Sequence, residues 1–443
     1  MSPAQSYTGM LLGILFLVSS VWAVSAGQAE YHVPDPRHLS KAKDLLQQFQ
    51  LIDTHVDTPQ VFRVMSRQPH DMIETMATGF PGHFDIPRAR EGGVGGVFFT
   101  VWSPCQDQIG VDVGPDFLNP DDTVRDVLEQ FDLINGIVEQ NNQTFSLATT
   151  AEEMEHAFSE GKIGVMMGME GSHMLGNSLA TMRVYASLGV RYLTLTHVCH
   201  SAFASSAGGG AGTDGSALKP VHAGNGLTDF GRALVLELNR LGVMVDLSHV
   251  TPQTMHDVLD ITRSPVLFSH SATRALYDHP RNIPDSVLER IGSKPGQNLG
   301  VIHSILTDLF MGPGNATIDT VVDHVEYIAH KCGKAHVGLG SDFDGMPSTV
   351  KGIDGDEDWP KLIAEFVRRG WTDDEIHGLV SGNLRRVMRE NEQVKRTLVA
   401  DLPSRAIYEK RTDLPAPNWG GPSGAYLPPK VRELVFHRRH DEL

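Results

Sequence analysis

The chain has 443 residues, of which 40% are hydrophobic and 21% charged, and its formal net charge is −17. This length and apolar content suffice for one large core, since single α/β barrels commonly exceed the usual domain size. The acidic balance leaves no basic surface for a phosphate backbone, so nucleic acid is not an expected partner.

The N-terminus predicts an export signal. Residues 10–24 are an apolar run that ends in small residues, as in a cleaved signal peptide, here residues 1–26. The run is shorter than the roughly 20 residues that span a bilayer, so we expect no membrane anchor. The last four residues, 440–443, read HDEL, a retrieval signal that predicts residence in the endoplasmic reticulum lumen, with secretion as the alternative.

Two further features fit a lumenal or secreted chain. The sequons at Asn142 and Asn315 predict glycosylation. Three cysteines allow one disulfide and leave one thiol over. Cys105 and Cys199 both follow predicted strands, which makes them the better pair and leaves Cys332.

The body of the chain alternates between strand and helix patterns. An entry segment, 27–44, leads into a first helical pattern within Pro34–Gln50. Helical patterns between the later strands include 122–139, 227–241, 252–261 and 318–331, and another covers 371–391. Eight β-rich runs are predicted as strands: 51–55, 94–102, 163–169, 190–197, 243–249, 265–270, 299–305 and 336–342.

Eight such repeats favour a (β/α)8 TIM-type barrel over residues 45–395. An open doubly wound sheet is less favoured because its first turn would usually carry a Gly-rich phosphate loop. The glycine cluster at 208–212 lacks that spacing and is interpreted as a surface loop. The Pro-rich residues 396–443 form a C-terminal extension.

Chemistry-bearing side chains stand where these strands end. His55 and Asp57 are two apart, so on an extended strand both point to one side and can share a metal. Glu170 ends an apolar run and is costly to bury without a cation, although a salt bridge or a helix N-cap is the plain alternative. His249 and His270 follow consecutive strands, and paired imidazoles suit Zn²⁺.

Three further residues are candidates for catalysis or binding. Asp342 ends the eighth strand and can act as a general base, with Asp344 as the alternative. His197 can donate a hydrogen bond to an oxygen that gains charge. Arg281 can grip a carboxylate, although a surface arginine is the plain reading.

The other histidines are less promising. His173, His200 and His303 lie near strand ends and have a smaller chance of touching substrate. Those within helical patterns are interpreted as solvated: His156, His256, His324 and His330.

Seven segments together resemble the membrane (renal) dipeptidase family of zinc peptidases, over about residues 45–395. They are HVD at 55–57, GMEG at 168–171, LTLTH at 193–197, DLSH at 246–249, FSH at 268–270, RNIPD at 281–285 and GSDFDG at 340–345.

The resemblance implies two Zn²⁺ ions per chain, with a hydroxide held between them that attacks the peptide bond. His55 and Asp57 match the ligands of one ion, His249 and His270 those of the other, and Glu170 the bridge. It also implies that Asp342 is the catalytic acid/base, that His197 and Arg281 contact substrate, and that Cys105 pairs with Cys199. The cysteines of the family's second disulfide are missing from this sequence. The glycolipid anchor of mammalian members is also not expected here.

The expected activity is hydrolysis of dipeptides, with a small peptide as partner and a homodimer as a possible assembly. The 301–306 segment and the Gly-rich loop depart from mammalian relatives, which leaves substrate preference open. In one alternative, the same fold hydrolyses a lactam or another amide, or acts on a Cys-Gly conjugate of a specialised metabolite. The other alternative is a non-catalytic lumenal scaffold.

Overall fold

The computed structural model describes residues 31–105, 121–210, 215–411 and 427–434. The export signal and the HDEL tetrapeptide lie outside these ranges, so both stay predictions. Within the described ranges no helix has the length and apolar character of a membrane span. Asn142 and Asn315 are both exposed, and their glycosylation also stays a prediction.

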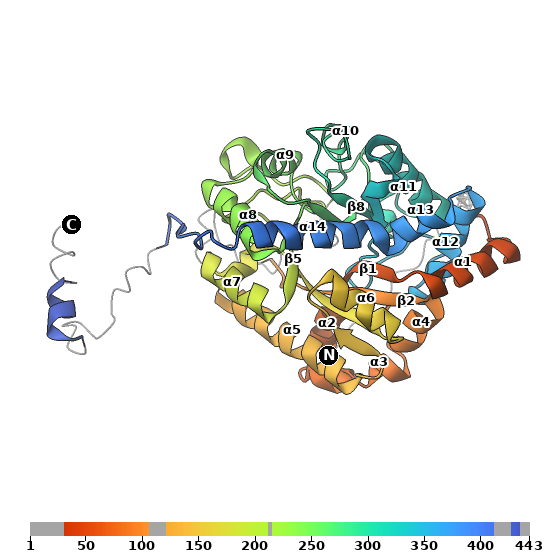
Figure 1. Ribbon diagram of the computed structural model, residues 1–443, viewed down its shortest axis with the longest axis horizontal. Coiled ribbons are helices and arrows are strands. Elements are labelled where there is room, and N and C mark those ends of the chain that lie inside the picture. The colour runs from red at the N-terminus through yellow and green to blue at the C-terminus, as the bar shows by residue number, and fades with distance from the viewer. Residues whose placement is uncertain (1–30, 106–120, 211–214, 412–426, 435–443) are drawn as a thin grey trace, which may run out of the picture.

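One parallel sheet forms the centre of the molecule (Figure 1). Its strands pair in the order β1-β2-β4-β5-β6-β7-β8-β9, and β3 pairs with β4 at one side. The strands are β1 (Leu51–Val56), β2 (Val94–Val101), β3 (Phe145–Leu147), β4 (Ile163–Glu170), β5 (Val190–Thr194), β6 (Met244–Asp246), β7 (Leu267–Ser271), β8 (Val301–Ser304) and β9 (Val337–Leu339).

Hydrogen bonds beyond β9 bring the sheet round to its first strand. The Asp342 amide donates to the His55 carbonyl at 3.1 Å, and the Asp57 amide donates to the Phe343 carbonyl at 2.9 Å. The sheet is therefore a nearly closed barrel, as the alternating pattern predicted.

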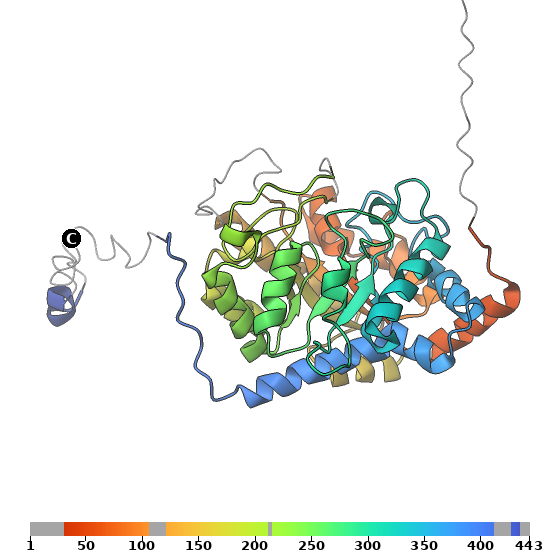
Figure 2. The same cartoon turned by 90° about the horizontal axis from the view of Figure 1, so that it is seen from above.

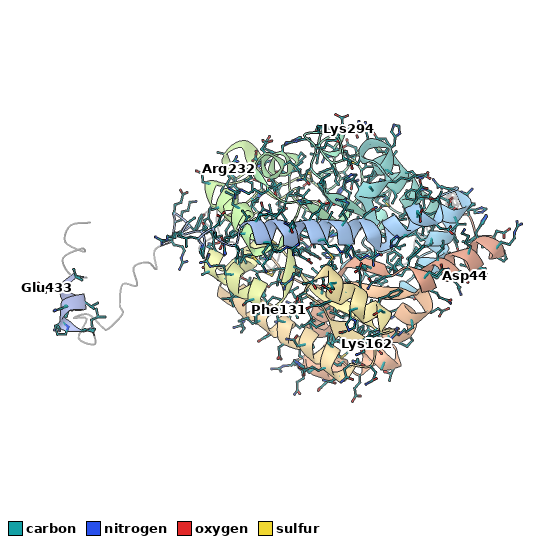
Figure 3. The ribbon with its side chains drawn as sticks, viewed as in Figure 1. Asp44, Phe131, Lys162, Arg232, Lys294 and Glu433 are labelled. Atoms are coloured by element: carbon teal, nitrogen blue, oxygen red, sulfur yellow. A yellow bond between two sulfur atoms is a disulfide. The ribbon has the colours of Figure 1, made fainter. Side chains whose placement is uncertain are left out.

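Helices surround this barrel and alternate with its strands. Figure 3 shows charged side chains such as Asp44, Arg232 and Lys294 at the periphery. The helices are α1 (Pro36–Gln48), α2 (Thr58–Met65), α3 (Thr75–Thr78), α4 (Ile86–Gly92), α5 (Asp121–Gln140), α6 (Ala151–Ser159), α7 (Leu179–Leu188), α8 (Asp229–Leu241), α9 (Pro252–Ile261), α10 (Asp285–Leu288), α11 (Ile318–Cys332), α12 (Trp359–Arg368), α13 (Asp373–His377) and α14 (Asn383–Thr397).

Sequence and local geometry agree on why several helices start where they do. Thr228, Thr251 and Thr372 each cap a helix by accepting a hydrogen bond from a backbone amide of its first turn. A capping box completes the last of these caps, since Glu375 reaches back to the amide of Thr372.

Helix α14 closes the amino-terminal end of the barrel. Figure 2 shows it running beneath the strands, opposite the loops that follow their carboxyl ends. Its Leu384, Val387 and Met388 are buried and belong to the same core cluster as interior residues of the strands, such as Phe98 and Tyr192. The barrel interior is therefore a packed core that leaves its opposite end for a site.

The largest corrections to the predicted strand boundaries fall at three carboxyl ends. β5 ends at Thr194 rather than His197, β6 at Asp246 rather than His249, and β9 at Leu339 rather than Asp342. In each case the chain leaves the sheet three residues before the polar side chain, because that side chain turns into the barrel mouth. The three-residue strand β3 was not predicted at all.

Candidate active site

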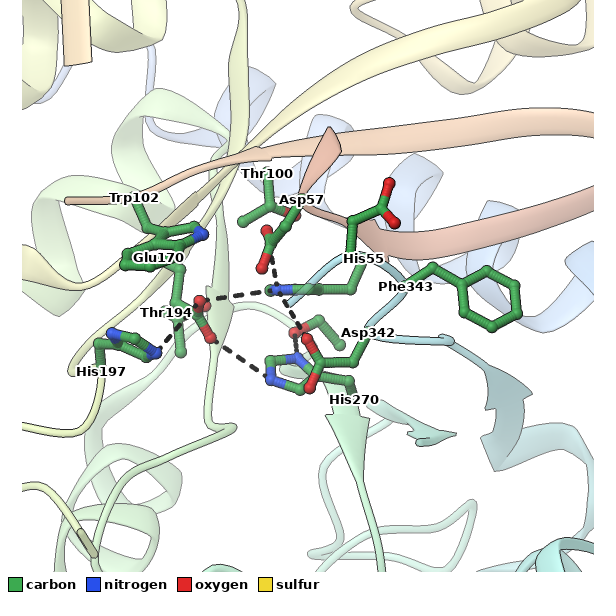
Figure 4. A network of polar contacts seen from close by, with 12 residues as sticks. His55, Asp57, Thr100, Trp102, Glu170, Thr194, His197, His270, Asp342 and Phe343 are labelled. Carbon is green, nitrogen blue, oxygen red and sulfur yellow. Dashed lines mark hydrogen bonds and ion pairs between the residues drawn. The ribbon is translucent and has the colours of Figure 1, made fainter. Parts of the chain in front are cut away.

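Side chains from four strands and the residues that follow them meet at the carboxyl-terminal end of the barrel (Figure 4). His55 lies in β1, Asp57 directly follows that strand, and Glu170 is the last residue of β4. His270 lies in β7, and His249 follows β6 by three residues. Because parallel strands end at the same rim, residues far apart in the sequence come together there.

The Glu170 carboxylate is the centre of this cluster. Its Oε1 lies 2.9 Å from His249 Nε2 and 3.4 Å from His270 Nε2. Its Oε2 lies 3.6 Å from His55 Nε2 and 3.7 Å from His197 Nε2. Each carboxylate oxygen thus faces its own pair of imidazoles.

Two aspartates complete the cluster. The Nε2 atom of His55 lies 3.6 Å from Asp57 Oδ1 and 3.9 Å from Asp342 Oδ1. Asp344 points elsewhere, since it accepts hydrogen bonds from the His83 amide and the Thr58 hydroxyl, both at 2.6 Å. The geometry therefore favours Asp342 over Asp344 as the residue that faces the cluster.

Metal ions fit this cluster. His55 Nε2, Asp57 Oδ1 and Glu170 Oε1 are buried and lack a hydrogen-bond partner, and the three residues bring their ligand atoms within 4.8 Å of one another. Such unpaired polar atoms are costly in a protein interior unless a cation binds them. Imidazole nitrogens with carboxylate oxygens are the donor set that zinc and similar divalent metals take.

The charges of the cluster are poorly balanced by the protein alone. Burial raises the pKa of Asp57 well above its ordinary value and that of Asp342 to about 7. Burial also lowers the pKa of His249 and His270 well below the ordinary value. For His55, burial opposes protonation, but the carboxylates of Glu170 and Asp57 outweigh it and raise the pKa to about 10. Such divergent shifts are typical of functional sites.

The backbone around the cluster is unusual. His249 and Asp342 adopt positive φ angles of 67° and 64°, which residues other than glycine rarely adopt. Gly345 lies so close that an added Cβ would stand 2.2 Å from Asp57 Oδ2 and 2.5 Å from Asp342 Oδ1. A glycine is therefore required where the loop after β9 passes the two carboxylates.

His197 and Arg281 flank the cluster. The His197 ring lies between the rings of Trp102 and His249, with centroid distances of 5.3 and 4.9 Å. Arg281 is 1% exposed, so it is not the surface arginine of the plain reading. Its guanidinium donates to the His270 carbonyl at 2.8 Å and to the Ser271 hydroxyl at 3.2 Å, and its Nε has no partner in the described chain.

The cavity above the cluster has walls that sequence reasoning missed. Apolar side chains line it together with Asp57, Glu170, His197, His249 and Asp342. Only Trp102, directly after β2, carried a positional signal. Gly210 also lines the cavity, so the Gly-rich loop contributes to the site and is more than a surface loop. The missed lining residues are Trp102, Thr307, Leu309, Phe310, Gly345 and Met346.

The remaining histidines stand apart from the cavity lining. His173 contacts the Ser103 carbonyl, His200 contacts the Lys219 carbonyl, and His303 is buried. His324 was predicted to be solvated, which is wrong. It is 1% exposed, and its Nδ1 accepts a hydrogen bond from the Thr273 amide.

A disulfide joins two walls of the site. Cys105 and Cys199 are bonded, as the resemblance implied, and both are buried. The bond ties the segment after β2, which carries Trp102, to the segment after β5, which carries His197. Cys332 is a buried free thiol that contacts the Leu288 carbonyl.

Comparisons with known proteins identify the family of this chain. Residues 39–401 match the family model of membrane dipeptidase, peptidase family M19. A protein of Schizosaccharomyces pombe named an uncharacterized dipeptidase is 39% identical over 358 residues, which cover 80% of this chain and 83% of that protein.

Solved structures show the same fold. The probable dipeptidase PvdM of Pseudomonas aeruginosa aligns with a TM-score of 0.70 and 21% identity, over 81% of this chain and 100% of that one. A metallo peptidase of Rhodobacter sphaeroides, solved with a phosphinate mimic of the dipeptide L-Ala-D-Ala, aligns with a TM-score of 0.66 and 24% identity, over 77% of this chain and 99% of that one.

The family match, together with groups of candidate metal ligands at the rim of the barrel, identifies the chain as an enzyme of the metallopeptidase class. The chain belongs to the membrane dipeptidase family, peptidase family M19.

Proposed function

We propose that the protein hydrolyses unblocked dipeptides with two zinc ions. The observation that carries the proposal is the convergence of three buried imidazole Nε2 atoms on the two oxygens of one buried carboxylate, Glu170. His55 and Asp57 would hold one ion, His249 and His270 the other, and Glu170 would bridge them. Two such ions supply Lewis acidity, which makes water a nucleophile at neutral pH and polarises a carbonyl.

The protein's own residues supply the remaining steps. Asp342 faces the cluster and takes the proton from the attacking water, then passes it to the leaving amine. His197 lies at the open side of Glu170 and donates a hydrogen bond to the oxygen that gains negative charge.

Arg281 is the proposed clamp for the carboxylate of the substrate. Burial lowers the pKa of its guanidinium to about 10, which still leaves it charged at neutral pH. Among the described residues it forms no ion pair, so its positive charge is available to bind an anion. Such a clamp favours a short peptide with a free C-terminus over a protein chain.

The cavity walls favour apolar side chains in the substrate. Trp102, Leu309, Phe310 and Met346 line it, and burial of an apolar side chain against them stabilises the complex. A dipeptide with an apolar residue is therefore the preferred substrate class within this proposal.

A pair of matched substrates tests the proposal. Zinc-loaded protein should cleave an unblocked apolar dipeptide and should lose most of that rate on its C-terminal amide, because the amide offers Arg281 no carboxylate. A chelator should abolish both rates, and added zinc should restore them. Equal rates on acid and amide would contradict the clamp, and chelator-resistant cleavage would contradict the metal assignment. A panel with lactams and Cys-Gly conjugates separates the alternative substrates.

A further inference from the structure

Two buried aspartates stand behind the site and have matching surroundings. Asp53 on β1 and Asp246 on β6 are both 0% exposed, and neither is ion-paired to a Lys or Arg in the described chain. Hydrogen bonds satisfy them instead. Asp53 accepts from the amide and the hydroxyl of Ser341. Asp246 accepts from the amide and the hydroxyl of Ser269, at 2.8 and 2.6 Å.

The two serines occupy equivalent positions. Each lies on the neighbouring segment of the barrel, and each directly precedes a residue of the cluster. Ser341 precedes Asp342, and Ser269 precedes His270. Each aspartate thus holds the segment next to it by the same two hydrogen bonds, at the point where a side chain turns into the mouth.

Two contacts distinguish the pairs. Asp246 also accepts a hydrogen bond from the Thr194 hydroxyl at 2.5 Å, and only Ser269 touches an imidazole ring. The Ser269 oxygen lies 2.8 Å from His270 Nδ1, whereas the Ser341 oxygen contacts the His55 carbonyl and no imidazole ring. Ser269 has a single hydroxyl proton, and the carboxylate of Asp246 at 2.6 Å is a stronger acceptor than the Ser248 hydroxyl at 3.5 Å. The Ser269 oxygen therefore accepts from His270, which must carry its proton on Nδ1.

This chain of contacts determines what the other ring nitrogen can do. With the proton on Nδ1, His270 keeps a lone pair on Nε2, the atom that lies 3.4 Å from Glu170 Oε1. A metal ligand needs that lone pair, and a fixed partner on the second nitrogen also fixes the ring orientation.

We propose that Asp246 and Ser269 are metal-positioning residues, which act through the Nδ1 proton of His270 to set its tautomer and ring orientation. The inference rests on the metal centre of the proposed function. Asp53 and Ser341 are the built-in comparison, because Asp53 accepts from the amide and hydroxyl of Ser341 as Asp246 does from those of Ser269, but Ser341 does not touch an imidazole.

The experiment measures zinc affinity of the full chain by competition with a chromogenic chelator. Ser269→Ala should lower the affinity for the zinc that His249 and His270 would hold by about 10- to 100-fold. Ser341→Ala removes the hydroxyl that bonds to Asp53, the equivalent aspartate, and should lower the zinc affinity much less. The melting temperatures of the two metal-free variants should fall to a similar degree, which separates positioning from a general loss of structure.

Two more variants keep the test decisive if Ser269→Ala folds poorly. Asp246→Asn preserves volume but removes the carboxylate that orients the Ser269 hydroxyl, so it should lose zinc as Ser269→Ala does. Ser269→Thr keeps the hydroxyl and should restore affinity. Wild-type affinity in Asp246→Asn, or equal losses in Ser269→Ala and Ser341→Ala, would overturn the inference. A wild-type chain that binds no zinc would instead overturn the proposed function.

Discussion

Asp342 lies in the left-handed region of the backbone, and its carboxyl group reaches the mouth of the barrel from the loop after β9. Hydrogen bonds hold the residues on either side of it. The Ser341 amide donates to Asp53, and the Phe343 amide donates to the Ser341 hydroxyl at 2.9 Å. A strained residue persists when its surroundings fix it in this way, and such residues cluster at active sites.

Replacement of Asp342 by Asn tests its assignment as the acid/base. The side chain keeps its shape but cannot take up a proton, so turnover of an unblocked dipeptide should fall by about 10²- to 10⁴-fold. Metal content, measured by atomic emission, should stay near that of the wild type. A variant that holds both ions and turns over at the wild-type rate would refute this role.

Side-chain chemistry explains which site residues were predictable from the sequence. His55, Asp57, Glu170, His249 and His270 carry polar groups after apolar runs, and that contrast marks a strand end. Leu309, Phe310 and Met346 carry no such contrast, because apolar residues in a loop resemble those that cover the core. Their place in the cavity depends on how the loops after β8 and β9 fold over the rim.

At the scale of elements, periodicity predicted the existence of strands and helices better than their ends or their positions. The helical pattern of 371–391 was recognised, but the structure divides it into α13, a π-helical turn at Gly378–Gly382 and α14. Nothing in the pattern indicates that α14 lies across the base of the barrel. That position follows from the apolar interior left open by eight strands, which has to be covered.

A substitution in α14 measures what this cover contributes. Leu384→Ala removes a buried side chain from the base of the barrel and should lower the free energy of unfolding by about 2 to 5 kcal/mol. The matched control is Gln393→Ala on the exposed side of the same helix, which should change it by less than about 0.5 kcal/mol. Urea denaturation of the three proteins checks this, and equal midpoints would show that α14 adds little.

Helix α12 provides a pH-dependent contact. Burial alone would raise the pKa of Glu365, but hydrogen bonds from Arg368 at 2.6 Å and Arg369 at 2.7 Å outweigh it and lower the pKa below its ordinary value of 4.5. A carboxyl with a lowered folded-state pKa stabilises the fold above its unfolded-state pKa, and this stabilisation disappears as the pH falls through the folded-state value.

Glu365→Gln should therefore be less stable than the wild type at pH 7, by about 1 to 3 kcal/mol. The difference should shrink as the pH falls below about 4.5, because the wild-type carboxyl then takes up its proton. Denaturant midpoints of both proteins over a pH series give the comparison. A difference that stayed constant with pH would show that the contact acts through packing alone.

At the scale of the whole molecule, the disulfide joins parts of the chain that are 94 residues apart. A cross-link over so long a loop restricts the unfolded chain and should contribute about 4 to 5 kcal/mol by loop entropy. The Cys105→Ala, Cys199→Ala double variant should lose much of that stability. It should also lower kcat as well as raise KM, because His197 and Trp102 would lose their common tether.

Cys332→Ala is the control for that comparison, since it removes a buried thiol without opening a cross-link. Thermal melts under non-reducing conditions, together with dipeptide kinetics, report both effects. A double variant as stable as Cys332→Ala would show that the disulfide constrains little.

The position of α14 also bears on how substrate would enter and products would leave. Leu384, Val387 and Met388 close the amino-terminal end of the barrel, so the barrel is open at one end only in the described chain. Under the proposed function, a peptide would reach Glu170 from the open mouth of the barrel, and both product amino acids would leave by the same route. Under the proposed function, a long polypeptide could not pass through the closed floor of the barrel, which favours short substrates independently of the carboxylate clamp proposed for Arg281.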